Sequence, residues 1–219
     1  MRFTMTITKR ISIYTRRVLR RINRVKRKKA DWAIIACLII GIIVAEQTMP
    51  PSINPTAYTP LLNVIARGES AGNYNAYFGN ASNQTIRFTS MTVAQVMEWQ
   101  KQYVDEGHAS NAVGRYQFMG TTLTGLVERQ HISPTALFDE QLQDRLAIAL
   151  IERRGSIAFV EGKVSQEQFA ANLAQEWAAL PRVLGGNPNE SYYAGDGLNH
   201  AKITTAEVLQ AVAVVKTKH

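Results

Sequence analysis

Glu69 is the residue of this sequence whose type and surroundings are best suited to chemistry. It ends an apolar helical run that begins at Leu61, and a Ser-Ala-Gly-Asn turn follows at once. Apolar surroundings and the negative end of a helix dipole both disfavour an ionised acid, so we expect a raised pKa. A carboxylic acid that stays protonated near neutral pH can give its proton to the oxygen of a glycosidic bond. A Glu at a helix end is more often only a solvated terminus, so a second signal is needed.

A second compact motif, Val113-Gly114-Arg115-Tyr116-Gln117-Phe118, follows about forty-five residues later. The amide of Gln117 can donate to and accept from an N-acetyl group, and Tyr116 offers a flat face with a hydroxyl. Gly114 permits close approach of the backbone to a sugar. Ser70 either hydrogen-bonds near Glu69 and the substrate or only closes the helix end. The candidate substrate-binding residues are therefore Ser70, Gly114, Tyr116 and Gln117.

Three patches, in this order and spacing, resemble the lysozyme-like lytic transglycosylases, in particular the lambda-type phage endolysins and the peptidoglycan-degrading proteins of phage particles. They are Ala66-Arg67-Gly68-Glu69, the motif at 113–118, and Glu176-Trp177-Ala178-Ala179-Leu180-Pro181, and the likeness covers about residues 60–185. The resemblance implies a mainly α (α+β lysozyme-like) domain that acts on the glycan strands of peptidoglycan. It also implies that Glu69 protonates the bond between N-acetylmuramic acid and N-acetylglucosamine. The same carboxylate would then deprotonate the 6-hydroxyl of the sugar, which closes a 1,6-anhydro ring.

Ordinary glycoside hydrolysis uses two carboxylates at a defined separation. No second acid stands out here, because Asp105 and Glu106 read as a helix terminus, Asp139 reads as a helix N-cap, and Asp196 is a candidate only by its charge. Two alternatives remain open. One is a hydrolytic muramidase on the same fold, and the other is a non-catalytic glycan-binding assembly protein.

The positive charge is confined to one end of the chain. Residues 1–30 hold twelve of the 25 Lys and Arg residues and no acid, so the remainder carries 13 basic against 17 acidic residues. The globular part therefore gives no reason to expect nucleic-acid binding. Four scattered histidines and no glycine-rich phosphate loop predict neither a metal nor another cofactor. The single cysteine, Cys37, excludes an intramolecular disulfide.

The N-terminal part predicts a membrane anchor. Residues 32–45 are uninterruptedly apolar, and as a helix they span about 21 Å, which can cross a bilayer with thinning and snorkelling. The positive-inside rule then makes 1–31 a basic cytoplasmic tail, 32–48 a transmembrane anchor, 49–60 a proline-rich linker and 61–219 the catalytic domain. This predicts a single-pass protein of the bacterial inner membrane with its domain in the periplasm, or one in a virion-associated membrane.

Other readings of this segment are a cleaved signal peptide ending at Ala45 and a buried core helix. The tail is either a basic amphipathic helix on an anionic leaflet or a solvated topogenic segment. The expected partners are membrane lipid, through 32–48 and the tail, and proteins of a virion or an envelope complex.

Beyond residue 60 the pattern is mainly helical. Thr59 is expected to cap the helix that ends at Glu69, Thr92 and Gln95 form a capping box, and Asp139 and Ser165 cap two further helices. Trp177, at helical spacing from Phe169, is expected in the core rather than as a sugar platform. Helices are expected at about 60–69, 92–106, 121–130, 139–154, 165–181 and 205–216.

Overall fold

The computed structural model describes residues 53–217. The predicted tail at 1–31, the predicted anchor at 32–48 and residues 49–52 of the predicted linker fall outside this range. Within the range, no helix is both long enough and apolar enough to cross a membrane.

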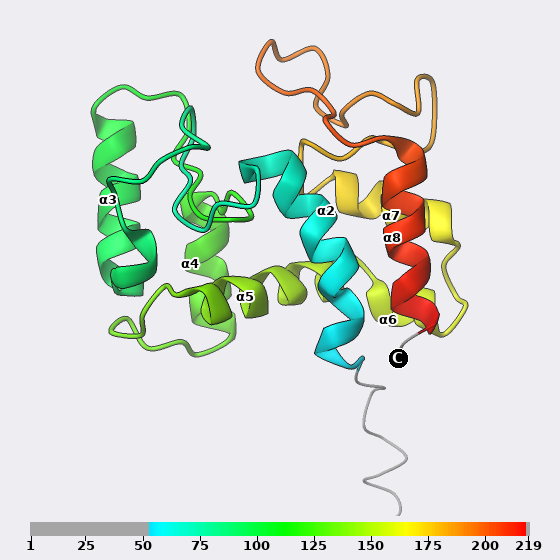
Figure 1. Ribbon diagram of the computed structural model, residues 1–219, viewed down its shortest axis with the longest axis horizontal. Helices are drawn as coiled ribbons and strands as arrows, with labels where there is room; N and C mark the ends of the chain where they lie inside the picture. The colour runs from blue at the N-terminus through cyan, green and yellow to red at the C-terminus, as the bar shows by residue number, and fades with distance from the viewer. Residues whose placement is uncertain (1–52, 218–219) are drawn as a thin grey trace, which may run out of the picture. The chain divides into compact units, whose positions relative to one another are not determined.

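The described chain is built of helices joined by loops (Figure 1). This confirms the mainly α prediction, whereas the β part is reduced, between residues 53 and 217, to isolated bridges such as Val113 with Phe118. In order, the elements are the 3-10 helix η1 (Pro55–Tyr58), α2 (Thr59–Ser70), the 3-10 helix η2 (Phe88–Ser90), α3 (Val93–Asp105), α4 (Gly120–Arg129), α5 (Glu140–Arg153), α6 (Ser156–Val160), α7 (Gln166–Ala174) and α8 (Thr205–Thr217).

Helix α2 occupies the middle of the fold (Figure 1) and packs against α5 and α8. Its buried face includes Leu61, Ile65 and Ala66, which recur at helical spacing. Gly68 lets the last turn come close to its neighbours, because a Cβ at this position would lie 2.8 Å from that of Ala179. The helix ends at Ser70, and the next residue, Ala71, adopts the left-handed conformation with φ 54°. The carboxylate of Glu69 is thus carried by a helix end that is packed on several sides.

The folded domain begins earlier than the predicted boundary at residue 61. Ile53, Ala57 and Tyr58 are buried, and the hydroxyl of Tyr58 lies 2.8 Å from that of Ser156. Residues 53–60 of the predicted linker therefore belong to the folded domain, and three of them are part of its core. The expected cap at Thr59 is also wrong, because Thr59 is the first helical residue and no side chain caps the helix.

The other predicted caps are confirmed. Thr92 and Gln95 form the reciprocal capping box of α3, the Asp139 side chain accepts from the backbone N–H of Leu142 at the start of α5, and Ser165 caps α7. The helix predicted to run to Pro181, however, ends at Ala174. The chain beyond it turns to place Trp177 and the following residues against α2.

Candidate active site

Glu69 lines a cleft of about 290 Å³. Besides Glu69, its lining comes from residues 77–81, Gln117, Ala178 and Ala179, residues 198–200 and Lys202. These segments are far apart in the sequence and meet at the C-terminal end of α2. The cleft is therefore the place where a substrate can reach the Glu69 carboxyl group.

The third sequence patch holds the carboxyl group of Glu69 in place. The backbone N–H of Ala179 donates to Glu69 Oε1 at 2.9 Å. Burial raises the pKa of Glu69 above its ordinary value of 4.5, while this hydrogen bond and the positive charge of Lys202 act in the opposite direction. Burial has the larger effect, so the direction expected from the sequence is found. The result is a carboxyl group that holds its proton to higher pH than a solvated one.

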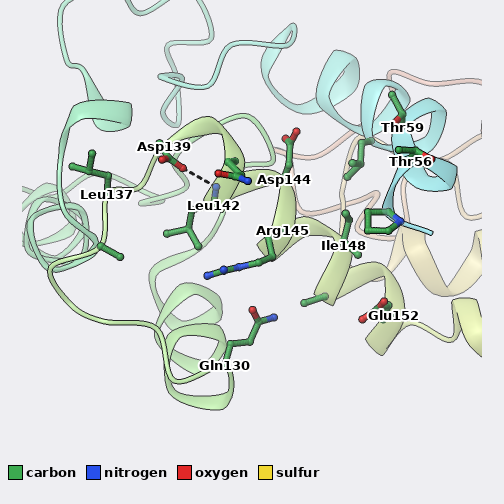
Figure 2. Close-up of a pocket in the computed structure, with 15 residues that line it drawn as sticks. Thr56, Thr59, Gln130, Leu137, Asp139, Leu142, Asp144, Arg145, Ile148 and Glu152 are labelled. Carbon is green, nitrogen blue, oxygen red and sulfur yellow. Dashed lines mark hydrogen bonds between the residues drawn. The ribbon is translucent and has the colours of Figure 1, made fainter. Parts of the chain in front are cut away.

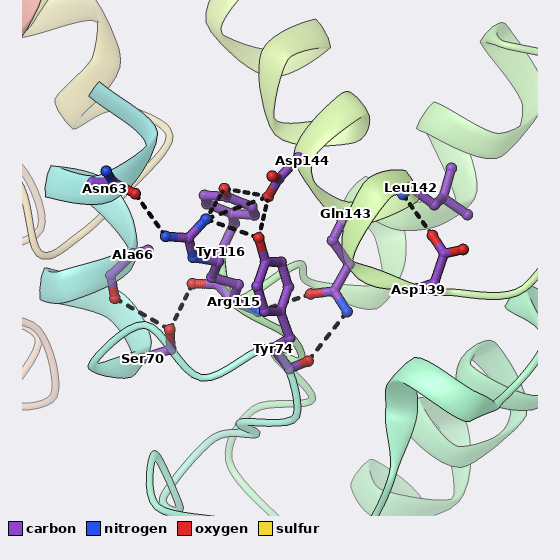
Figure 3. Close-up of polar contacts among 10 residues, drawn as sticks. All are labelled: Asn63, Ala66, Ser70, Tyr74, Arg115, Tyr116, Asp139, Leu142, Gln143 and Asp144. Carbon is purple, nitrogen blue, oxygen red and sulfur yellow. Dashed lines mark hydrogen bonds and ion pairs between the residues drawn. The ribbon is translucent and has the colours of Figure 1, made fainter. Parts of the chain in front are cut away.

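Ser70 lies in the interior rather than in the cleft. Its side chain is fully buried, and Oγ lies 3.1 Å from the carbonyl oxygen of Ala66 and 2.7 Å from that of Arg115 (Figure 3). The hydroxyl ties the end of α2 to the 113–118 motif. This corrects the expectation that Ser70 contacts substrate and favours the reading in which it only closes the helix end.

Tyr116 is also a core residue, with 1% of its surface exposed. Its hydroxyl donates to Oδ1 of Asp144 at 2.6 Å, and the Arg115 guanidinium donates to the same hydroxyl at 3.0 Å (Figure 3). Burial and the bond to Asp144 raise the pKa of Tyr116 strongly. Tyr74 joins this network by donating to Asp144 at 2.9 Å. The expectation of a sugar contact through Tyr116 is therefore corrected, because its polar atom faces α5.

Gly114 serves packing rather than contact with a sugar. Its φ is +79°, in the left-handed region that favours glycine. A Cβ would collide with the amide oxygen of Gln143 and would lie 3.2 Å from Phe138. The Gln143 amide oxygen in turn accepts from the backbone N–H of Arg115 at 2.9 Å. The close backbone approach expected at Gly114 is thus made to α5 and its preceding loop.

Gln117 is the one expected substrate-binding residue of the four that lines the cleft with Glu69. Its backbone is in the left-handed region, with φ 49°, and its Nε2 donates to the carbonyl oxygen of Gly114 at 2.9 Å. This conformation turns the side chain away from the core that receives Tyr116 and Phe118. A role for Gln117 in binding stays a prediction.

Trp177 is buried, as expected. Its Nε1 donates to the carbonyl oxygen of Tyr116 at 3.2 Å, so it links the second and third patches from inside. The sequence did not single out Tyr77, Asn80, Asn199 and Lys202, which also line the cleft. They lie in loops without periodicity, and only the fold brings them to Glu69.

The acids considered as partners for Glu69 are engaged elsewhere. Asp196 accepts from the backbone N–H groups of Leu198 and Asn199, both at 2.8 Å, and hydrogen bonds from Asn199 and Leu198 lower its pKa. Asp105 pairs with Lys101 on α3. Among the described residues that line the cleft, Glu69 is the single carboxylate.

A larger hollow of about 840 Å³ lies between η1, the start of α2 and α5 (Figure 2). It carries Asp139, Asp144 and Glu152, so it is a rival location for acid chemistry. However, Asp139 caps α5 at 2.8 Å from the Leu142 nitrogen, and Asp144 is bound by two tyrosines. No group of three His, Cys, Asp or Glu residues that could hold a metal ion occurs between residues 53 and 217. The structural engagement of two of its acids makes this hollow the weaker candidate.

Comparison with known proteins gives a family for this site. The family model described as Endolysin matches residues 59–196, which contain all three patches. A similar solved structure is bacteriophage lambda lysozyme complexed with a chitohexasaccharide, with 18% sequence identity and a TM-score of 0.45, covering 77% of this chain and 96% of that chain. No curated protein matches the sequence. Since the family model spans well over half of the chain, this protein belongs to the endolysin family of peptidoglycan-degrading enzymes.

Proposed function

We propose that this chain is a peptidoglycan lytic transglycosylase that cleaves the β-1,4 bond between N-acetylmuramic acid and N-acetylglucosamine, with Glu69 as both acid and base. The observation that carries this proposal is the single carboxylate among the described residues of the cleft. A hydrolase that activates water or forms a glycosyl-enzyme needs a second carboxylate on the other side of the scissile bond. An intramolecular attack by the substrate does not.

The proposed reaction has two proton transfers. Glu69 first gives its proton to the glycosidic oxygen, and the N-acetylglucosamine side leaves with a free hydroxyl group. The resulting carboxylate then accepts the proton of the 6-hydroxyl of the muramoyl residue, and O6 bonds to the anomeric carbon. The 1,6-anhydro ring closes, Glu69 is protonated again, and no water is consumed.

The surroundings of Glu69 suit both halves of this cycle. Burial raises the pKa of the acid, which favours its protonated form before the first transfer. The N–H of Ala179 binds Oε1, which leaves Oε2 to carry the proton. Once the proton has gone, the same N–H and the charge of Lys202 stabilise the carboxylate until it is needed as a base.

The walls of the cleft suit an N-acetylated glycan. Asn80, Gln117 and Asn199 supply neutral amides that can donate to and accept from acetamido and hydroxyl groups. Tyr77 also lines the cleft, and its hydroxyl accepts from Asn80 Nδ2 at 3.1 Å. Neutral amide donors and acceptors suit the acetamido and hydroxyl groups of sugars.

The test is digestion of purified sacculi by the full chain in heavy-oxygen water, followed by mass spectrometry of the released fragments. The proposal expects anhydro-muramoyl ends without label. Label at the anomeric position of most products would establish the alternative, a hydrolytic muramidase. Products of neither kind, with glycan binding retained, would point to the non-catalytic alternative, a glycan-binding assembly protein.

We also propose that residues 32–48 anchor the protein in the bacterial inner membrane, with the domain on the periplasmic side. Support comes from the apolar run and from the twelve basic residues that precede it. A tethered enzyme of this kind degrades the wall locally, in phage lysis, in phage entry or beside a secretion-type apparatus.

A further inference from the structure

We propose that Lys202 forms a subsite for the acidic stem peptide of the muramoyl residue, so that the cleft selects peptidoglycan over neutral N-acetylated glycans. This inference deepens the proposed function and depends on the assignment of the cleft around Glu69. The ligand class is a carboxylate carried by a peptide on the glycan, and the recognising group is the Lys202 ammonium.

Lys202 is held beside Glu69 by the backbone. Its N–H donates to the carbonyl oxygen of Ala179 at 2.9 Å, and the N–H of Ile203 donates to the same oxygen at 3.2 Å. The backbone N–H of the same residue, Ala179, donates to Glu69, so Ala179 links the acid to the lysine. Ile203 is buried and anchors this link. The Lys202 ammonium can therefore move on its own flexible stem, while its Cα is fixed relative to the reacting bond.

The charge of Lys202 has no counter-charge of its own in the described part of the chain. Among residues 53–217 its ammonium takes part in no ion pair and no side-chain hydrogen bond, whereas Arg67 on the outer face of α2 is paired with Glu207 at 2.6 Å. Asp196, in the same loop as Lys202, is committed to its own turn. The other ionisable groups that line the cleft are Glu69, Tyr77 and His200.

The charged side chains of the cleft come from different segments of the chain. Residues 77–81 and Gln117 contribute no charged side chain, whereas the 198–202 segment contributes Lys202. While Glu69 holds its proton, Lys202 leaves the cleft with a net positive charge. A peptidoglycan strand alternates neutral N-acetylglucosamine with N-acetylmuramic acid, whose side chain carries an acidic peptide. A strand seated in the cleft can therefore place an acidic substituent beside the 198–202 segment, where the Lys202 ammonium can bind it.

The experiment compares the full chain with its Lys202→Met and Lys202→Arg variants, with Lys163→Met as the matched control. Lys163 is an exposed lysine in the turn after α6 that is paired with Glu161, and it does not line the cleft. Initial rates are measured on soluble glycan strands that carry stem peptides, at a pH on the activity plateau of each variant. Affinity for neutral chitohexaose is measured by calorimetry in a Glu69→Gln background.

We expect Lys202→Met to raise KM on the peptide-bearing strands about three- to fivefold, the range of a partly exposed ion pair, in addition to any fall in kcat that follows from removing a positive charge beside Glu69. Lys202→Arg should restore KM, Lys163→Met should leave it unchanged, and chitohexaose affinity should not respond to any of them. The KM of the wild type, but not of Lys202→Met, should rise with salt concentration.

Equal losses of affinity for the acidic and the neutral glycans would overturn the subsite, because Lys202 would then contact the sugar backbone. A fall in kcat with unchanged KM would also overturn it, because Lys202 would then act only through the pKa of Glu69. An unchanged KM would refute it directly. Failure of the transglycosylase proposal can be distinguished from failure of the Lys202 subsite. If the wild type incorporates heavy oxygen into its products, it is a hydrolase, and its KM still reports whether Lys202 binds the stem peptide.

Discussion

At the scale of single residues, Glu69 is defined by two opposing effects. Burial penalises its charge, and the Ala179 N–H and Lys202 favour that charge. An acid that must both give and take a proton needs neither form to be overwhelmingly stable. The contacts around Glu69 thus suit a group that changes charge twice in each turnover.

Replacing Glu69 by Gln should abolish wall degradation while leaving the fold intact. The amide has the shape of the acid but cannot supply a proton, and general acid–base catalysis contributes at least about 100-fold to the rate. Loss of turbidity of purified sacculi measures the activity. Glu190→Gln, the same change at an exposed acid outside the cleft, is the control and should retain full activity. Activity of Glu69→Gln within a few-fold of the wild type would move the chemistry elsewhere.

The same substitution should change the pH dependence of stability. Because the folded protein raises the pKa of Glu69 above 4.5, its stabilising contribution is complete below pH 4.5 and is lost as pH rises through the folded value. Glu69→Gln removes this loss. Its melting temperature relative to the wild type should therefore increase between pH 4 and pH 8, as followed by circular dichroism. A difference that is constant over this range would contradict the raised pKa.

The raised pKa of Glu69 was predictable from its residue type and its place at a helix end, while its catalytic role stays a prediction. The directions in which the neighbouring candidates point were not predictable. Ser70, Gly114 and Tyr116 have the chemistry of sugar contacts, but their spacing does not say which way each one faces. The directions are set by Gln143 and Asp144, about thirty residues after the motif. Because Gln143 and Asp144 on α5 bond to the 113–118 motif, most of the motif is buried in the core. The sequence around the motif does not indicate these distant partners.

At the scale of elements, α2 positions Glu69 only because its last turn approaches the 178–179 segment closely. Gly68→Ala should disturb this contact, because the added Cβ would lie 2.8 Å from the Cβ of Ala179 and 3.0 Å from Ile203. We expect a loss of about 1–3 kcal/mol in the free energy of unfolding. Activity should fall as well, since the Ala179 N–H is moved away from Glu69.

Gly125→Ala is the matched control for that prediction. Gly125 also lies inside a helix, α4, and its new Cβ would meet only the flexible end of Arg129, at 3.0 Å. Here the substitution should stabilise the protein by about 0.5–1 kcal/mol, because alanine favours the helix. Urea unfolding monitored by tryptophan fluorescence measures both variants. A Gly68→Ala variant as stable as Gly125→Ala would show that the contact tolerates a methyl group.

Helix starts were easier to predict than the end of α7. Caps such as Thr92, Asp139 and Ser165 act on backbone groups within three residues, so the sequence carries the whole signal. The end of α7 depends on partners elsewhere, because Trp177 and Ala179 leave the helical path to bind Tyr116 and Glu69. The helical spacing of Trp177 from Phe169 therefore suggested a longer helix than the structure has. The burial of Trp177 was predicted correctly, because it depends on the type of side chain rather than on the length of the helix.

At the scale of the whole molecule, the folded domain and the predicted anchor are nearer in sequence than expected. The domain includes Ile53, so only residues 49–52 separate it from the predicted anchor at 32–48. Of the four prolines in the predicted linker, Pro55 begins η1 and Pro60 lies in the first turn of α2. Pro fits the first turn of a helix as well as an extended linker, which is why composition could not decide between them.

The proposed topology can be tested with one thiol, because Cys37 is the only cysteine. After Cys37→Ala, a cysteine is introduced at Ala109, which is exposed in the loop after α3. With the domain outside the inner membrane, a membrane-impermeant maleimide should label position 109 in spheroplasts without any further permeabilisation. A second cysteine variant at Thr4, in the basic tail, should react only after detergent is added, because the proposed topology places the twelve basic residues in the cytoplasm. Labelling of 109 only after detergent would reverse the orientation, and a mature mass that lacks residues 1–45 would replace the anchor with a signal peptide.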